Sequence, residues 1–395
     1  MNMPHDPFLQ NPIDAGQVIP SAIKPSAQVS IIRLALGAVA ILVALLLGLL
    51  VLLVIGTETG PIALLVGFVA ATLPVPLYIG LVLWIDRYES EPLWMLATAF
   101  FWGALIAVFF AFLFNTASGL IVAAMTRSLT AGEMFAAVIS APIVEETAKA
   151  LILFIFFFWK ADEFDGVVDG IVYASLVGLG FAMTENIQYY GKAALTGGGG
   201  GLTLIFIVRG AFAPFSHPLF TSMTGIGLGL ARQTRNTAVR ILAPILGLLV
   251  AICMHSIWNG SAAIFGGGVF LLTYLLVMVP AFLIMLVVIA LALRREGQLV
   301  RQFLITDCER GLLTHQEYDQ LCTIRGRMGS SFNAFTGGGI GRWRARMRFN
   351  QLASELAFHR SRVSRGVFPA SQDPRQRETS YLQALQDLLQ EIRSH

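Results

Sequence analysis

The sequence predicts an all-α protein, a polytopic bundle of about eight transmembrane helices with a small helical cytoplasmic tail. Of its 395 residues, 56% are hydrophobic and only 13% are charged. The mean hydropathy is +0.71, which is far above that of an ordinary soluble domain. Apolar stretches long enough to cross ~30 Å of hydrocarbon, which takes ~20 helical residues, recur between residues 29 and 293.

Eight membrane spans are expected, separated by polar or glycine-containing connections. They cover residues 29–55, 61–85, 93–124, 134–159, 166–190, 202–231, 238–264 and 268–293. We expect the third span to tilt or break near Asn115 and Gly119, and the sixth to kink at Pro214 and Pro218. Five glycines at 197–201 predict a flexible connection, or alternatively a hinge that lets spans five and six separate for a substrate.

These spans divide the chain into three expected parts. They are a polar cytoplasmic N-terminal segment (1–28), an eight-span membrane domain carrying the active site (29–293) and a basic, partly helical cytoplasmic tail (294–395). The first apolar run, 29–55, is too long for a cleavable signal and is expected to stay as an anchor. The three cysteines show no CxxC spacing, so neither a disulfide framework nor a zinc finger is indicated.

Positive residues gather in alternate connections, which predicts the orientation. One set of connections carries Arg87, Lys160, Arg232, Arg235, Arg240, Arg294 and Arg295. The opposite set carries only Arg127 and Lys192. By the positive-inside rule, this is a multi-pass protein of the cell membrane with both termini in the cytoplasm.

The tail is basic, with sixteen arginines, no lysine and ten acidic residues between 294 and 395. Two short helices around a turn at Gly311 are expected within 299–326, and 379–393 has the apolar spacing of a helix. Between 342 and 349, arginines alternate with Trp343, Met347 and Phe349. Beside a membrane, this pattern favours binding to anionic lipid headgroups over binding to nucleic acid, so the lipid bilayer is an expected partner and nucleic acid is not.

Span four contains three charged residues, Glu145, Glu146 and Lys149, with apolar sequence on both sides. Each unpaired charge would cost ~2.5 to 3.5 kcal/mol at the bilayer centre, so all three are expected to face protein or trapped water. Lys149 lies four residues after Glu145 and three after Glu146, and its ammonium can reach either carboxylate. One glutamate therefore needs partners from other spans.

Spans five to seven contain suitable partners. They are Glu185 and Asn186 in span five, Arg209, His217 and Thr221 in span six, and His255 and Asn259 in span seven. Counted along their helices, Glu145, His217 and His255 fall near the middle of the membrane, and Glu185 is shallower. Carboxylates and imidazoles in a dry cavity can hold a metal ion, activate water or carry protons. HExxH and GxSxG motifs are absent, so the residues alone leave a hydrolase and a proton-linked transporter open.

The ordered set Glu145-Glu146-x-x-Lys149, Phe181-x-x-x-Glu185-Asn186, His217-x-x-x-Thr221 and His255-x-x-x-Asn259 resembles the PrsW family of intramembrane proteases. That family belongs to the assemblage of type II CAAX prenyl proteases and bacteriocin-processing membrane enzymes. The resemblance covers about residues 60 to 290. It implies an endopeptidase that hydrolyses membrane-tethered proteins near the outer half of the bilayer, with an anti-sigma factor as the best-known type of substrate.

The resemblance also implies roles for individual residues. It suggests catalytic roles for Glu145, Glu146, His217, His255 and Asn259, and supporting roles for Lys149, Glu185, Asn186, Arg209 and Thr221. Zn²⁺ held by Glu146, His217 and His255 is the implied cofactor, and a metal-free mechanism using glutamate and histidine is the alternative. Residues 311–318 of the tail resemble a short bacterial oligomerisation motif, so oligomerisation through the tail is also expected.

Two other functions are alternatives to the protease. A non-catalytic membrane scaffold of the same fold is known within the assemblage, but it lacks the carboxylates that are retained here. A proton- or ion-coupled transporter usually shows internal repeats, and the two halves of this chain share no duplicated motif.

Overall fold

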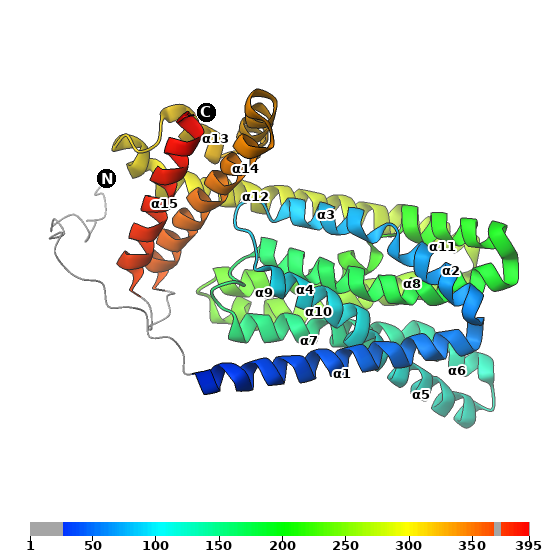
Figure 1. Cartoon of the computed structure of the whole chain (residues 1–395). Coiled ribbons are helices and arrows are strands. Elements are labelled where there is room, and N and C mark those ends of the chain that lie inside the picture. Colours follow the sequence, from blue (N-terminus) through cyan, green and yellow to red (C-terminus); the bar gives the residue numbers. More distant parts are fainter. Residues whose placement is uncertain (1–26, 367–372, 395) are drawn as a thin grey trace. The chain divides into compact units, whose positions relative to one another are not determined.

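The computed structural model describes residues 27–366 and 373–394, and all regular structure in these ranges is helical. The all-α membrane prediction is therefore confirmed. Almost all of the expected N-terminal segment, 1–28, lies outside the described residues. The chain forms two compact units, Met1–Val43 and Ala44–His395. In the first, the described residues are the beginning of helix α1 (Ala27–Thr59), and the second contains the remaining helices (Figure 1).

The first half of the larger unit continues from α1 through short helices, some of which are π-helical (η). Their order is α2 (Pro61–Thr72), α3 (Val75–Ile85), α4 (Leu93–Phe101), η1 (Trp102–Ala107), α5 (Val108–Thr126), α6 (Leu129–Phe135), η2 (Ala136–Ser140) and α7 (Ala141–Trp159).

The second half holds longer helices and the tail. Their order is α8 (Val167–Phe206), η3 (Ile207–Phe212), α9 (Ser216–Gln233), α10 (Thr237–Phe265), α11 (Gly267–Thr273), η4 (Tyr274–Met278), α12 (Val279–Glu309), α13 (His315–Leu321), α14 (Ile324–Arg365) and α15 (Pro374–Ser394).

Six stretches of the described chain are long and apolar enough to cross a membrane. They are Ile31–Thr59, Pro61–Ile85, Leu93–Thr126, Val167–Gln233, Thr237–Phe265 and Gly267–Glu309. The fourth has 67 residues, enough for two passes. Helix α7 is not among the six, and it carries three charged residues. The eight expected passes therefore correspond to these six stretches, with the fourth counted twice, together with α7.

Local breaks in the helices differ partly from expectation. In the third span the irregular turn is η1, whereas Asn115 and Gly119 lie in the regular helix α5, so the expected break near them is wrong. Asparagine is polar but does not break a helix, and the Asn115 side chain hydrogen-bonds to Glu145. The expected kink at Pro214 is confirmed, because the helix stops after Phe212 and α9 begins at Ser216.

The glycine run 197–201, where a flexible connection or a hinge is expected, lies within helical structure. Helix α8 continues through it, with a single non-helical residue, Gly198, at φ 57° and ψ −148°. Because a side chain is strained at that φ, glycine is the residue that allows the chain to reverse there. The two predicted spans therefore meet at a tight turn.

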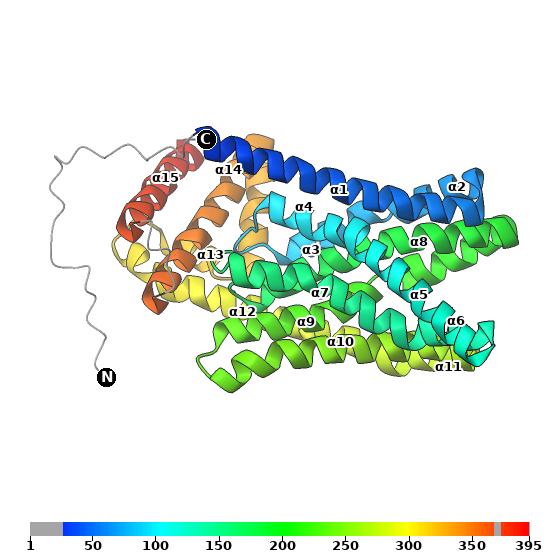
Figure 2. The ribbon, with the colours of Figure 1, turned by 90° about the horizontal axis from the view of Figure 1, so that it is seen from below.

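The first part of helix α8, residues 167–182, is buried throughout. Helices α7 and α9 pack against α8, and α10 packs against α9 and α7 (Figure 2). Small residues make this close packing feasible. A Cβ on Gly178 of α8 would lie 2.6 Å from the backbone nitrogen of Pro218 in α9. The absence of a side chain at Gly178 therefore brings the backbone of His217 directly against α8.

The tail docks against one end of the membrane helices. Arg362 of α14 pairs with Glu89 at 2.7 Å, and Arg365 pairs with Asp165 at 3.0 Å. Arg232, at the end of α9, donates to the Phe164 carbonyl at 3.0 Å. The connections with the excess of positive residues therefore lie at the same end as the tail.

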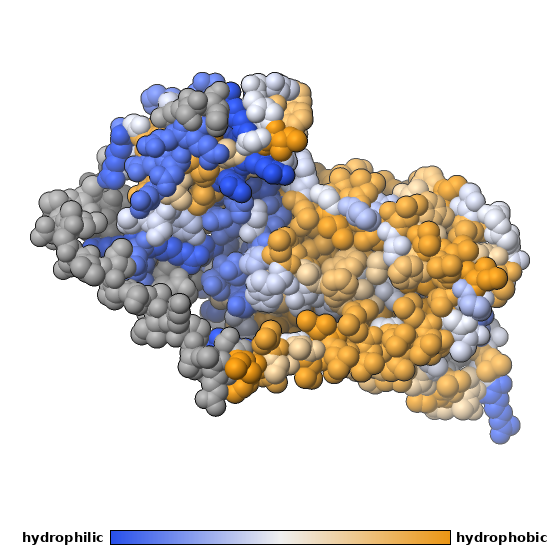
Figure 3. Space-filling model, viewed as in Figure 1, coloured by the Kyte–Doolittle hydropathy of each residue, from blue (hydrophilic) through white to orange (hydrophobic). Residues whose placement is uncertain are grey.

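The expected tail helices are only partly separate. Helix α12 continues past residue 293 to Glu309, so the first of the two short helices is the end of a membrane helix. The turn at Gly311 is confirmed by its φ of 79°, and the predicted helix over 379–393 corresponds to α15. Within the oligomerisation-like segment, Leu313 and Tyr318 are buried within the same chain. On the face shown in Figure 3, hydrophobic residues cover the bundle and hydrophilic residues gather over the tail.

Candidate active site

Helix α7 places two carboxylates and an ammonium group inside the bundle. The Lys149 Nζ lies 2.8 Å from Glu146 Oε1 and 3.5 Å from Glu145 Oε2. It also lies 2.9 Å from His217 Nδ1 and 3.8 Å from the centre of the Phe181 ring. Lys149 thus contacts both carboxylates, and Glu146 more closely.

The carboxylate of Glu146 is fully engaged. Its Oε1 accepts a hydrogen bond from the Lys149 ammonium and lies 3.0 Å from His255 Nδ1. Thr221 Oγ1 donates to its Oε2 at 2.9 Å. The whole side chain is inaccessible to solvent. A buried carboxylate with such partners is suited to orienting neighbouring groups.

The carboxylate of Glu145 has a different environment. Its Oε1 accepts a long hydrogen bond of 3.4 Å from Asn115 Nδ2. Its Oε2 is buried without a hydrogen-bond partner among the described residues, and lies 3.9 Å from His255 Nε2. Because buried polar atoms are nearly always satisfied, this oxygen marks a position for water or another ligand.

The partners of the two imidazoles determine their tautomers. An ionised Glu146 can only accept, so His255 donates from Nδ1 and leaves its Nε2 lone pair facing Glu145. A charged Lys149 can only donate, so His217 accepts at Nδ1 and donates from Nε2 to Glu185 Oε2 at 3.0 Å. The two rings lie 5.2 Å apart, and the His255 ring stacks on Phe220.

Glu185 and Arg209 form a more accessible rim. Arg209 Nη2 lies 2.5 Å from Glu185 Oε2, and its Nε donates to Asn186 Oδ1 at 2.6 Å. Both charged side chains are 21% exposed, whereas Lys149 and Glu146 are fully buried. The cluster is therefore less enclosed by protein on the Glu185 side, where η3 supplies Arg209.

Asn259 is placed one turn after His255, but its described hydrogen bond goes elsewhere. Its Nδ2 donates to the Ala137 carbonyl at 2.9 Å and ties α10 to η2. This π-turn immediately precedes α7, so the bond helps to fix the start of the helix that carries Glu145. One amide hydrogen of Asn259 is not used by this bond.

A polar chain beside Glu145 was missed from the sequence. Ser118 Oγ donates to Ser140 Oγ at 2.8 Å, Ser140 donates to Asn115 Oδ1 at 2.9 Å, and Asn115 donates to Glu145. The sequence does contain a signal for this chain, because Asn115 is a polar residue in an apolar span. On its own, however, that signal suggests only a break in the helix.

The described cluster holds three carboxylates, Glu145, Glu146 and Glu185, and two permanent cations, Lys149 and Arg209. With both imidazoles neutral, one negative charge is in excess. A proton or a metal ion would restore balance in this low-dielectric site.

One donor set in the described chain could hold a metal ion. Ligand atoms of Glu145, His217 and His255 all lie within 4.8 Å of one another and are buried. This set differs from the predicted one, which had Glu146 in place of Glu145, because the oxygens of Glu146 are bonded to lysine, threonine and histidine. Two histidines and a glutamate fit a catalytic Zn²⁺ site, provided that His217 releases one of its two hydrogen bonds.

Fold and cluster together define a polytopic membrane protein with an internal acid–base site. Residues 91–285, which include every predicted site residue, match the model of the PrsW family intramembrane metalloprotease. The chain belongs to the PrsW family and is an intramembrane protease. The resemblance found in the sequence is thus confirmed.

Individual relatives agree with this assignment. A protein named Protease PrsW from Oceanobacillus iheyensis is 31% identical over 203 residues, which cover 51% of this chain and 82% of the relative. The protein of the same name from Geobacillus kaustophilus is 34% identical over 37% of this chain and 58% of its own length. The protein of the same name from Bacillus subtilis is 30% identical over 44% of this chain and 72% of its own length. No solved structure matches the chain.

Proposed function

We propose that this protease cleaves membrane-tethered proteins with Glu145 as the base that activates water. The observation that carries the proposal is Glu145 Oε2, which has no hydrogen-bond partner among the described residues and lies 3.9 Å from His255 Nε2. Two atoms at this separation can both be ~2.8 Å from one water molecule, which then makes one hydrogen bond to each. Glu145 is therefore in position to take a proton as that water attacks a peptide carbonyl.

The other predicted residues support this step. Glu146 fixes the tautomer of His255, and Lys149 and Thr221 hold Glu146 in place. Glu145 passes its proton to the departing amine when the tetrahedral intermediate collapses. We assign the remaining amide hydrogen of Asn259 to stabilising the oxyanion. The family assignment as a protease favours this function over the scaffold and the transporter.

A metal-dependent mechanism is the alternative. Zn²⁺ is the metal that the donor set suits, held by Glu145, His217 and His255, and Glu145 would then act as a ligand rather than as the base. When bound, it would polarise the peptide carbonyl and strengthen its water as a nucleophile. Glu146 would then orient His255 from outside the metal, as carboxylates commonly do for metal-binding histidines. Metal analysis of the purified protein tests this. One equivalent of zinc in wild type and its loss in His217→Ala are expected, and full activity with negligible metal contradicts it.

The depth of the site supports cleavage on the side away from the tail. Glu145 lies 14 residues before the tail-side end of α7, and His255 lies 18 residues after that of α10. At 1.5 Å per residue, these are ~21 and ~27 Å, beyond the middle of a ~30 Å hydrocarbon layer. With the tail in the cytoplasm, as the clustered positive residues favour, the cut falls in the outer half of the bilayer.

The substrate class we propose is a protein with one membrane span and an extracytoplasmic region, of which a single-span anti-sigma factor is the candidate. Comparison of membranes from cells with and without the active protease, with mass spectrometry of new termini, should reveal such a protein cut near its outer membrane boundary. Cysteine replacements at Arg127 and Arg235 fix the sidedness. Cytoplasmic cuts, or labelling of position 235 from outside, would contradict the proposal.

A further inference from the structure

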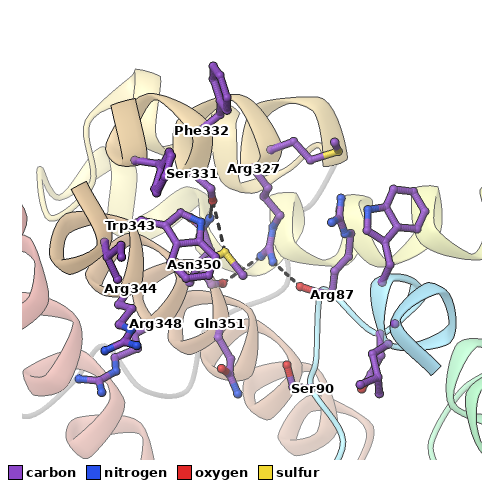
Figure 4. A pocket seen from close by; sticks show the side chains of 18 residues that line it. Arg87, Ser90, Arg327, Ser331, Phe332, Trp343, Arg344, Arg348, Asn350 and Gln351 are labelled. Carbon is purple, nitrogen blue, oxygen red and sulfur yellow. Dashed lines mark hydrogen bonds between the residues drawn. The ribbon is translucent and has the colours of Figure 1, made fainter. Parts of the chain in front are cut away.

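A cavity far from the Glu–His cluster in sequence and lining residues lies between α14 and the end of α3. Its volume is about 1030 Å³. Helix α14 reverses at Gly339, where φ is 68°, and its two arms are joined by the bond from Asn350 Nδ2 to Ser331 Oγ at 3.2 Å. Figure 4 shows Arg327 at the centre of this cavity, with Arg87 on the α3 side and Arg344 and Arg348 on the second arm of α14.

The walls of this cavity are unusually apolar for a tail outside the membrane. On α14, Phe332, Phe335 and Ile340 line it and are 65%, 49% and 58% exposed. Leu83 and Trp84, at the end of the membrane helix α3, continue the same lining and are also exposed. An apolar surface that runs from a membrane helix onto a tail helix can be covered by acyl chains of the adjacent leaflet.

Arginines of the cavity lining have guanidinium groups without a carboxylate partner in the described chain. Arg87 Nε and Nη1 are buried without a hydrogen-bond acceptor there. Burial lowers the pKa of Arg87, as expected for a charge removed from water without a countercharge. Arg344 and Arg348 are exposed and make no described ion pair. The lining contains these three arginines, Arg327 and one carboxylate, so it is positively charged.

Two acceptors in the cavity lining are also unsatisfied. Asp86 Oδ1 and Asn350 Oδ1 are buried without donors among the described residues, and both side chains are more than nine-tenths buried. Arg327 is not available to them, because it donates to the carbonyls of Arg87, Leu321 and Asn350. The cavity therefore needs a ligand with both an anionic group and hydrogen-bond donors.

We propose that this cavity binds an anionic glycerophospholipid from the tail-side leaflet, with its phosphate at Arg87 and its acyl chains against Phe332, Phe335 and Ile340. Headgroup hydroxyls supply donors to Asp86 and Asn350, and Arg344 and Arg348 attract the negative headgroup. A soluble phosphate compound would leave the apolar walls uncovered. The bound lipid would join the tail to the bilayer beside the loop that also receives Arg327 and Arg362.

The test uses the full chain, delipidated in detergent and titrated with phosphatidylglycerol or phosphatidylcholine under native mass spectrometry. The matched pair of variants is Arg344→Gln/Arg348→Gln, on the cavity wall, and Arg310→Gln/Arg325→Gln, exposed arginines of the tail outside it. Wild type should retain one phosphatidylglycerol in preference to phosphatidylcholine. Affinity should fall about fivefold for each cavity arginine removed, Arg87→Gln included, and the Arg310/Arg325 variant should bind like wild type.

Photoreactive phosphatidylglycerol locates the bound lipid. Its acyl chain should crosslink to peptides from 328–347, and glycerol phosphate or inorganic phosphate should not compete. Equal retention of the two lipids, equal loss in the two double variants, crosslinks confined to other helices, or full competition by the soluble phosphates would each overturn the proposal.

Discussion

Ion pairs hold the tail against the membrane helices, and ion pairs also organise the Glu–His cluster, but the two regions balance their charges differently. In the tail, Arg362 pairs with Glu89 and Arg360 binds both Asp307 and Glu378. Each of these carboxylates has an arginine, and the side chains retain some contact with solvent. The intramembrane cluster has one more carboxylate than cations, and its innermost pair, Glu146 and Lys149, is sealed from solvent.

This difference separates docking from chemistry. Ion pairs that are balanced in charge and partly exposed to solvent contribute modestly to stability. One such pair can be lost at little cost, because solvent replaces the missing partner. In the sealed cluster, a lost partner leaves a charge that nothing replaces, and the excess carboxylate must take a proton, a metal ion or a polarised water. Glu145 is the member left without a full set of partners, which is why we assign it the reactive role.

The largest structural effect is expected from Lys149→Met. It leaves Glu146 buried without its cation, which typically costs about 3–5 kcal/mol of stability. Thermal unfolding in detergent and accumulation in membranes measure this effect. Lys149→Met/Glu146→Gln is the matched control, because it removes both charges and should recover most of the stability. Normal accumulation and unchanged melting of Lys149→Met would contradict the role of Lys149.

A smaller effect is expected from Thr221→Val, which keeps the side-chain shape and removes the donor to Glu146 Oε2. Loss of a hydrogen bond to a buried charge should lower stability by about 1.5–3 kcal/mol and reduce cleavage without abolishing it. Melting and the cleavage rate of a tethered reporter are the readouts. Thr224→Val is a suitable comparison, since Thr224 is buried on the same helix and its Oγ1 has no described partner. Equal losses in the two variants would argue against the Glu146 contact.

The smallest effect is expected in the tail. Arg362→Gln removes the pair with Glu89, and its other contacts to the 160–165 connection are partly replaceable by water. We expect about 1 kcal/mol of local destabilisation, seen as faster hydrogen exchange in α14 and α15. Exchange in α7 to α10 should not change. Faster exchange throughout the membrane helices would show that docking of the tail also stabilises the Glu–His cluster, contrary to this account.

The sequence could predict the bundle and most of the cluster for a simple physical reason. Charged residues are so unfavourable in hydrocarbon that Glu145, Lys149 and His255 stand out against apolar neighbours. It could not predict which glutamate Lys149 prefers, because spacings of three and four are both reachable and Thr221 and His255 decide between them. Nor could it predict the contact of Asn115 with Glu145, which depends on how α5 packs against α7.

The backbone irregularities were harder still to predict. Glycines at 197–201 are typical of a flexible loop. That the chain reverses direction at a single residue, Gly198, depends on how the helical segments on either side pack. The π-turn η1 contains Gly103, and η2 ends two residues before Pro142, but neither residue by itself distinguishes a π-turn from a regular or kinked helix. By contrast, Pro214 removes a backbone donor and fixes φ, and the break there followed directly from the sequence.

The central claim is that the two adjacent glutamates have different tasks, Glu145 in chemistry and Glu146 in orientation. It is tested most directly by comparing Glu145→Gln with Glu146→Gln for melting temperature and for single-turnover cleavage of a tethered reporter in the same membranes. Glu145→Gln should lose 10²–10⁴-fold in rate with an unchanged melting temperature. Glu146→Gln should lower the melting temperature as well as the rate, because Lys149 then lacks its closest counterion. A Glu145→Gln protein that cleaves at the wild-type rate, or a Glu146→Gln protein that alone loses activity without loss of stability, would contradict the account.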